Sequence, residues 1–321
     1  MTDDVIPARR SWIVRNATTI VATVAVGLYA LFVQWAWGWA KVLALWQDVG
    51  VVQVLAAILL LLLTYVLRTW RIHDYFPQET RGQFPRLLRL VQVHNLLNVM
   101  LPFRTGEVSF PVLMKREFGL AMARGTSALL VMRLLDLHAL LAAAGIGLAL
   151  ERQASWAWGV WVCFVGLPAL GFAIRKQAFR FTHRFAPPRL SSVLEELEAG
   201  LPKDAAAFLR AWLVTLVNWL VKVVVLAWVI LLLDNLPVSA AFGGALGGEL
   251  SSVLPVHAPG GAGTYPAGIT AGALAFGAAR DSAALTSLGQ AAVNAHLMII
   301  VTSVIGTVVS MLVAMSRPGK A

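Results

Sequence analysis

Six stretches of about twenty apolar residues divide this chain of 321 residues. An α-helix needs about 20 apolar residues to cross the hydrocarbon core of a bilayer. The stretches lie at 16–34, 49–67, 124–150, 155–174, 209–233 and 284–314. Only 13% of the residues are charged, against about 25% in soluble domains. We therefore expect an all-α polytopic membrane protein with six transmembrane helices and a single integral membrane domain over residues 1–321.

Basic residues between these stretches predict the orientation of the chain. They gather in four places, which are Arg9 to Arg15, Arg68 to Arg89, Arg175 to Arg210 and Arg317 to Lys320. Because Lys and Arg concentrate on the cytoplasmic side, both termini are expected in the cytoplasm and the protein in the inner (cytoplasmic) membrane. The net charge of +10 then favours contact with anionic lipid headgroups and not with nucleic acid.

Two polar segments interrupt the apolar pattern, at 94–107 and 249–263. Proline, glycine and charged residues are costly in hydrocarbon unless they line a protein or water cavity. The predicted orientation brings the two segments in from opposite sides, which indicates two oppositely oriented re-entrant helical hairpins in an inverted repeat. The first repeat is 49–150 and the second 209–315, with a cytoplasmic interfacial segment at 175–208. Ordinary loops or further full spans are the alternatives.

The first polar segment contains residues suited to an anion. His94 and Asn98 are four residues apart and would share a helix face, which Pro102 would end. Arg104 could bind a phosphate through two hydrogen bonds, and Glu107 could hold that arginine or bind a cation. The alternative is a structural Arg104–Glu107 pair at the membrane surface.

Three further ionisable residues fall within predicted spans. Arg133 and Asp136 are three residues apart, so both can face the same interior, and Lys222 is a cation near membrane depth. Intramembrane ionisable residues are candidates for a functional site. The alternative is that Arg133 and Asp136 form an ion pair with a purely structural role.

The second polar segment combines Glu249 and His257 with a glycine-rich turn. Such a turn can present backbone N–H groups to an anion, or it can allow close helix packing. The turn is not a P-loop, because no Gly-Lys-Ser/Thr follows it. The expected substrate-binding residues are therefore His94, Asn98, Arg104, Glu107, Arg133, Asp136, Lys222, Glu249, His257, Gly260, Gly261 and Gly263.

No combination of residues indicates an enzyme. The histidines lack a His-Glu-x-x-His spacing, and no Gly-x-Ser-x-Gly is present. The single cysteine, Cys163, excludes an intramolecular disulfide. We expect no catalytic residues, no metal site and no cofactor.

The segment Asn98 to Glu107, which reads Asn-Val-Met-Leu-Pro-Phe-Arg-Thr-Gly-Glu, resembles a signature Asn…Leu-Pro-x-Arg-x-Gly-Glu. That signature belongs to the flippase-like membrane region of lysylphosphatidylglycerol synthases and their stand-alone relatives. Arg133, Asp136 and the Leu-Pro and Gly-Gly-Ala-Gly-Thr runs within 254–264 reinforce the resemblance. One departure is Pro266, because relatives usually carry a glutamate shortly after the glycine run.

The resemblance implies movement of an anionic-headgroup lipid, or of a polyprenyl-phosphate-linked glycan carrier, between leaflets. Because the chain stops at Ala321, we expect a stand-alone member without the aminoacyl transferase domain. Membrane lipids are the expected partners, and a homo-oligomer or an envelope-biosynthesis protein remains open as a further partner. Two other functions remain open, namely a non-transporting lipid-binding partner of an envelope-synthesis enzyme and an intramembrane lipid phosphatase or transferase.

Overall fold

The computed structural model describes residues 12–152, 154–185, 187, 190–253 and 258–316, and these ranges contain helices and no β-strand. The predicted all-α class is therefore confirmed. In chain order the helices are α1 (Trp12–Ala36), α2 (Trp39–Ala44), α3 (Val51–Tyr75), α4 (Phe84–Met100), η1 (Pro102–Val108), α5 (Ser109–Phe118), α6 (Met122–Arg152), α7 (Ser155–Phe185), α8 (Ser191–Ala199), α9 (Ala205–Leu233), α10 (Val238–Val253), η3 (Pro259–Gly261), α11 (Thr264–Ala275) and α12 (Ser282–Met315).

Five of these helices are long and apolar enough to cross a membrane, namely α3, α6, α7, α9 and α12. They correspond to five of the six predicted spans. The remaining span corresponds to α1, which has 25 residues, but its apolar part within the described side chains is the shorter stretch Thr23–Ala36. The chain is a multi-pass membrane protein.

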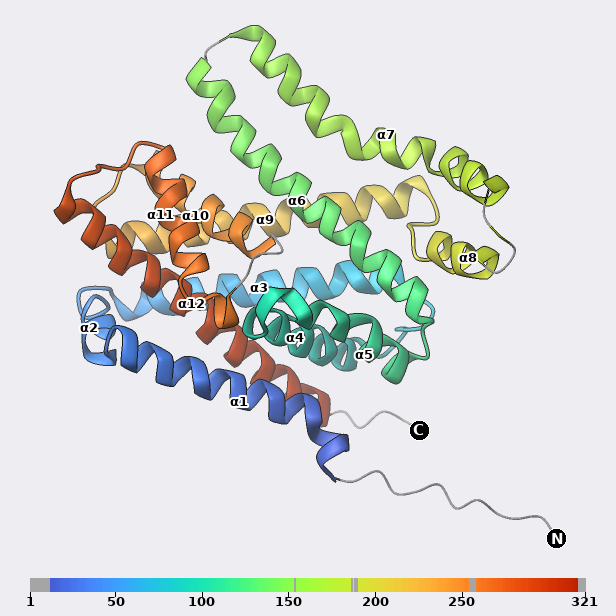
Figure 1. Cartoon of the computed structure of the whole chain (residues 1–321), viewed down its shortest axis with the longest axis horizontal. Helices are drawn as coiled ribbons and strands as arrows, with labels where there is room; N and C mark the ends of the chain where they lie inside the picture. The colour runs from blue at the N-terminus through green and yellow to red at the C-terminus, as the bar shows by residue number, and fades with distance from the viewer. Residues whose placement is uncertain (1–11, 153, 186, 188–189, 254–257, 317–321) are drawn as a thin grey trace.

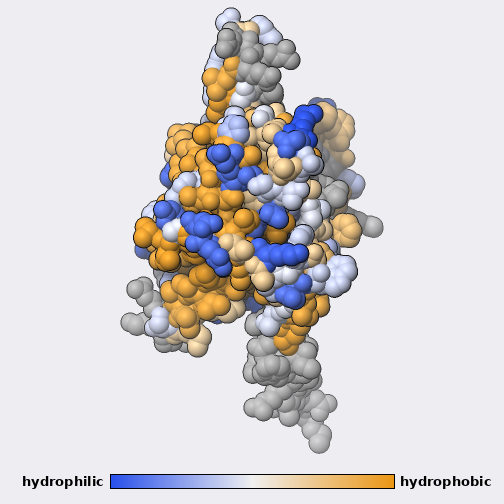
Figure 2. Space-filling model, turned by 90° about the vertical axis from the view of Figure 1, so that its left-hand side faces the viewer, coloured by the Kyte–Doolittle hydropathy of each residue, from blue (hydrophilic) through white to orange (hydrophobic). Residues whose placement is uncertain are grey.

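The long helices alternate in direction (Figure 1). Helices α1, α6 and α9 run toward the end of the bundle that carries α2, whereas α3, α7 and α12 run back toward the end that carries α8. The start of α1 and the end of α12 lie at the α8 end. Figure 2 views the opposite end, where hydrophilic residues gather in the middle of the face and hydrophobic residues lie mainly to their left and below. Polar residues in the middle of this face fit a bundle end that faces water.

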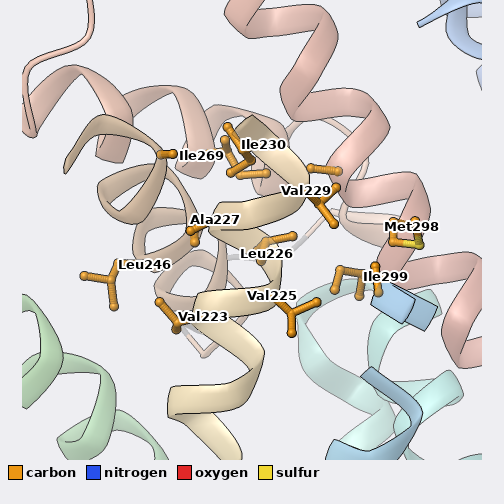
Figure 3. Packing of buried hydrophobic residues seen from close by; sticks show 14 of the residues in the cluster. Val223, Val225, Leu226, Ala227, Val229, Ile230, Leu246, Ile269, Met298 and Ile299 are labelled. Atoms are coloured by element: carbon orange, nitrogen blue, oxygen red, sulfur yellow. The ribbon is translucent and has the colours of Figure 1, made fainter. Parts of the chain in front are cut away.

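The apolar core surrounds α9. Ile230, Leu226 and Val229 are completely buried and face residues of α10, α11 and α12, as Figure 3 shows. In lipid, burial of apolar surface gives little driving force, so close van der Waals packing and hydrogen bonds hold helices together. The inner helices are packed in this way, whereas α7 has no buried residue.

Both polar segments form helical hairpins. Helices α4 and α5 enter from the α8 end, α10 and α11 enter from the α2 end, and the turns meet in the middle of the bundle (Figure 1). At the first turn, Leu101 is extended before Pro102, as expected for a residue that precedes proline. Phe103 and Arg104 then adopt left-handed backbone conformations, with φ of 50° and 56°, which non-glycine residues rarely do.

The second hairpin depends on a very close approach of its two helices. A Cβ atom added at Gly247 would lie 2.1 Å from the carbonyl oxygen of Gly268, so no other residue fits there without displacing α11. Small residues at such a contact let helix backbones approach closely.

Two helix ends differ from the prediction. Helix α3 continues to Tyr75 and α7 to Phe185, beyond the expected ends at 67 and 174. Arg68 and Arg71, which were expected in the gap after this span, therefore lie on α3 itself. Arg71 is 4% exposed and points at an acidic partner inside the bundle.

Candidate functional site

The turn of the first hairpin contains a carboxylate between two arginines. Glu107 forms an ion pair with Arg104, three residues earlier, and its Oε1 lies 3.0 Å from Nε of Arg133 on α6. Arg104 also donates a hydrogen bond to the main-chain oxygen of Val253 at the end of α10. The predicted Arg104–Glu107 pair is thus present, and it links η1 to both α6 and the second hairpin.

Asp136 is the centre of the adjoining contacts and is 1% exposed. Its Oδ1 accepts hydrogen bonds from Arg71 at 2.7 Å and from the Trp219 indole at 2.9 Å. Nη1 of Arg133 lies 3.5 Å from the other carboxylate oxygen. Arg71 also donates to Thr215. An ion buried in this way needs several partners, because removal from water costs several kcal/mol per ion.

A second buried ion pair joins α9 to α10. Nζ of Lys222 donates to Oε2 of Glu249 at 2.8 Å, and the Tyr265 hydroxyl donates to Oε1 at 2.6 Å. Glu249 is completely buried. Tyr265 belongs to α11, so one carboxylate connects a spanning helix with both arms of the second hairpin.

Trp219 joins these two groups of residues into one network. Its indole N–H donates to Asp136, while the ammonium of Lys222 lies 5.1 Å from the centre of its ring, within the range of a cation–π contact. We define the polar cluster as the five cations Arg68, Arg71, Arg104, Arg133 and Lys222 with the three carboxylates Glu107, Asp136 and Glu249. Five cationic side chains face three anionic ones, so the polar cluster has two positive charges in excess.

His94 and Asn98 border the polar cluster from α4. His94 is buried, and its Nδ1 lies 2.9 Å from the Ser109 hydroxyl of the second arm of the hairpin. The side-chain oxygen of Asn98 is buried without a hydrogen-bond partner in the described part of the chain. Arg68 donates to the neighbouring Asn95 at 2.8 Å. A cavity of about 20 Å³ lies among Arg68, His94, Arg133 and Asp136, enough for roughly one water molecule.

The predicted glycines lie at the turn of the second hairpin. Gly260 and Gly261 have positive φ angles and are buried, and a Cβ at Gly260 would lie 2.4 Å from the Tyr29 ring. The N–H of Gly261 donates to Ala258 within the turn at 2.8 Å, so it is already used. Gly263 precedes α11 and has open space around it. His257, which was also predicted, lies outside the described residues.

An apolar cavity of about 470 Å³ lies beside the meeting turns. Its walls come from α1 and from both hairpin turns, and they include Leu28, Phe32, Met100 and Pro259. Tyr29 also lines it, and its hydroxyl lies 3.3 Å from Nδ1 of His296. The His296 ring stacks on Tyr265, with the ring centres 4.6 Å apart. A chain of contacts therefore runs from the polar cluster to this cavity.

Arg68, Arg71, Trp219 and Tyr265 were not among the predicted site residues. The two arginines were attributed to the topology signal because basic residues follow them closely in sequence. Trp219 and Tyr265 resemble any aromatic residue of an apolar helix. The available signal was helical spacing, because Lys222 and Trp219 are three residues apart and can share a face. In the part of the chain that the structure describes, no group of three or more acidic, histidine or cysteine residues is placed to hold a metal ion.

These features define a multi-pass α-helical membrane protein in which the turns of two hairpins meet beside a partly buried cluster with excess positive charge. The chain belongs to the family described as the lysylphosphatidylglycerol synthase TM region, which matches residues 20–303. The matched residues include both hairpins and the whole polar cluster. No curated protein and no solved structure matches the chain.

Proposed function

We propose that this protein moves a lipid with an anionic headgroup between the leaflets of the inner membrane, and that the polar cluster binds the headgroup. The lipid is a phospholipid or a polyprenyl-phosphate-linked carrier. The observation that carries the proposal is the excess of two positive charges in the polar cluster, where Arg68, Arg104 and Arg133 are half-buried. A phosphate offers the compensating charge, and arginine can bind it through two parallel hydrogen bonds.

In this proposal the two hairpins are re-entrant and form the gates on either side of the polar cluster. Their arms have 17, 10, 16 and 12 residues, fewer than the roughly 20 needed to span the hydrocarbon core. The arms enter from opposite ends, and the turns meet in the middle (Figure 1). Opposed broken helices of this kind surround the substrate sites of several transporter folds. The α8 end faces the cytoplasm, in accordance with the basic residues that gather there.

The apolar cavity beside α1 supplies a place for a hydrocarbon chain. It adjoins the same two turns that hold Arg104 and Gly260. A lipid could therefore keep its chain against α1 while its headgroup enters the polar cluster from the side. Such an arrangement places both parts of an amphipathic substrate in matching surroundings.

The hairpin turns must separate for a headgroup to enter. The cavity among the cations has room for about one water molecule, much less than a phosphodiester requires. Arg104 connects the two turns through its bond to Val253, and its left-handed backbone conformation costs of the order of 1–3 kcal/mol. Release of this bond, with transfer of Arg104 to the phosphate, is the proposed opening step.

The test is leaflet exchange of fluorescent phosphatidylglycerol in proteoliposomes. The wild-type protein should exchange the lipid, and Arg104→Gln should reduce the rate at least tenfold, because the headgroup loses its first cation. Arg116→Gln removes an exposed charge from the same hairpin and serves as the control. Wild-type exchange by correctly folded Arg104→Gln would refute the role of the turn. An absence of exchange of phosphatidylglycerol and of a polyprenyl-phosphate lipid, with retained binding of either, would favour the non-transporting lipid-binding role.

A further inference from the structure

A second basic site lies at the α8 end of the bundle, separate from the polar cluster. It is a pocket of about 430 Å³ between the segment after α3, the start of α6, the middle of α7 and the connection from α8 to α9. None of its lining residues belongs to the polar cluster. The argument for this pocket is therefore independent of the proposed transport function.

Four cations and one carboxylate line this pocket, namely Arg124, Arg175, Lys176, Lys203 and Glu198. Arg124 already forms an ion pair with Glu79 at 2.5 Å. Within the described ranges, no acidic side chain lies within ion-pair distance of Arg175, Lys176 or Lys203. Three cations with only Glu198 to balance them leave the pocket positively charged.

Arg175 is held in a fixed position. Its guanidinium lies 3.4 Å from the centre of the Phe172 ring, which stacks on Phe208 of α9 with ring centres 4.4 Å apart. Nη1 donates to the main-chain oxygen of Phe172 at 2.7 Å, and Nη2 lies at 3.4 Å from that of Lys203. An arginine has five N–H donors, so donors remain for a ligand. Fixing a side chain in advance lowers the entropy that binding costs.

The helices around the pocket carry the side-chain pattern of a membrane interface. Phe181 and Phe185 on α7 and Leu190 and Val193 near α8 are exposed apolar side chains beside exposed basic ones. Alternation of apolar and basic side chains is typical of segments that lie at the membrane interface. The pocket therefore opens where both lipid headgroups and soluble anions can reach it.

We propose that this pocket binds a phosphate-bearing anion through the fixed guanidinium of Arg175 and the ammonium groups of Lys176 and Lys203. Charge-assisted hydrogen bonds from a planar guanidinium group and two ammonium groups match the oxygens of a phosphate. The same chemistry suits a phospholipid headgroup in the adjacent leaflet and a free phosphate compound in solution. The experiment below distinguishes these sources.

The test uses the full chain in phosphatidylcholine nanodiscs and the double variant Lys176→Gln/Lys203→Gln. Both lysines are exposed, so the substitutions should leave the fold intact. Arg180→Gln/Arg184→Gln is the matched control, since it removes two exposed charges from α7 outside the pocket. One arm titrates inorganic phosphate by calorimetry. The other measures retention of added phosphatidylglycerol by native mass spectrometry.

Binding by the wild type that falls about tenfold in the double variant, and not in the control, supports the site. Loss in the phosphate arm identifies a soluble ligand, and loss confined to the phosphatidylglycerol arm identifies a lipid headgroup. Equal binding by the double variant and the control in both arms, or no binding by the wild type in either, would overturn the proposal.

Discussion

Lys222 and Glu249 form a buried pair that either supports the fold or binds substrate. The two roles can be separated, because loss of one partner leaves an uncompensated buried charge whereas loss of both does not. We expect Glu249→Gln to lower the free energy of unfolding by about 3–5 kcal/mol. The double variant Lys222→Met/Glu249→Leu should recover most of this loss and still fail to exchange lipid.

Denaturant unfolding in detergent, run beside the leaflet-exchange assay, measures both effects. Asp234→Gln provides a comparison, since Asp234 is only partly buried at the hydrophilic end and its partner is the Ser287 hydroxyl. Full transport by the double variant would show that the pair is architectural.

Sequence spacing could predict only those ion pairs whose partners lie on one helix or turn. Arg104 with Glu107 and Arg133 with Asp136 are three residues apart, and both pairs are present. The shortest contact of Asp136 is with Arg71 on a different helix. Such a partner depends on how α3 packs on α6, which no local pattern specifies.

Gly106 controls how the first hairpin turns. A Cβ atom at this position would lie 2.4 Å from the main-chain oxygen of Leu97 and 2.5 Å from the nitrogen of Asn98. Neither backbone atom can move without unwinding the end of α4. We therefore expect Gly106→Ala to lower the free energy of unfolding by about 1–3 kcal/mol.

Gly159→Ala on α7 is the matched control for this prediction, because nothing lies within 4 Å of the added carbon and alanine favours a helix. Thermal unfolding of the two variants beside the wild type provides the measurement. Equal midpoints for Gly106→Ala and the wild type would contradict the described turn.

The existence of the elements was predictable, and their ends were less so. Apolar length located the spanning helices, and the proline and glycine positions located both hairpins. The ends of α3 and α7 were misplaced because charged residues were taken to mark the membrane surface. Arg71 instead continues α3 inside the bundle, where Asp136 and Thr215 supply the partners that water would otherwise supply.

The opposite entry of the two hairpins is a property of the whole molecule and can be tested by thiol labelling. In a Cys163→Ser background, Gln78→Cys lies before the first hairpin, and Asn235→Cys lies before the second, both at exposed positions. A membrane-impermeant maleimide should label Asn235→Cys in intact spheroplasts, and Gln78→Cys only after the membrane is opened. Gln47→Cys should behave like Asn235→Cys. Labelling of positions 78 and 235 from the same side would contradict the inverted arrangement.

The inverted arrangement is a prediction from the sequence, based on basic residues that alternate between the gaps, and the thiol labelling tests it. The meeting of the two turns, and the network that Trp219 completes between them, could not be predicted in this way. They depend on contacts between residues on different helices, such as Trp219 with Asp136, which are 83 positions apart. The resulting excess of positive charge appears only when the whole bundle is assembled.

The central claim is that this excess charge selects an anionic headgroup. The most direct measurement compares the leaflet exchange of phosphatidylglycerol with that of phosphatidylcholine in the same proteoliposomes. The two lipids carry identical acyl chains, and the comparison is made for the wild type and for Arg133→Gln. We predict faster exchange of phosphatidylglycerol by the wild type and loss of this preference in Arg133→Gln. Equal rates for the two lipids, or a preference that survives the substitution, would contradict the claim.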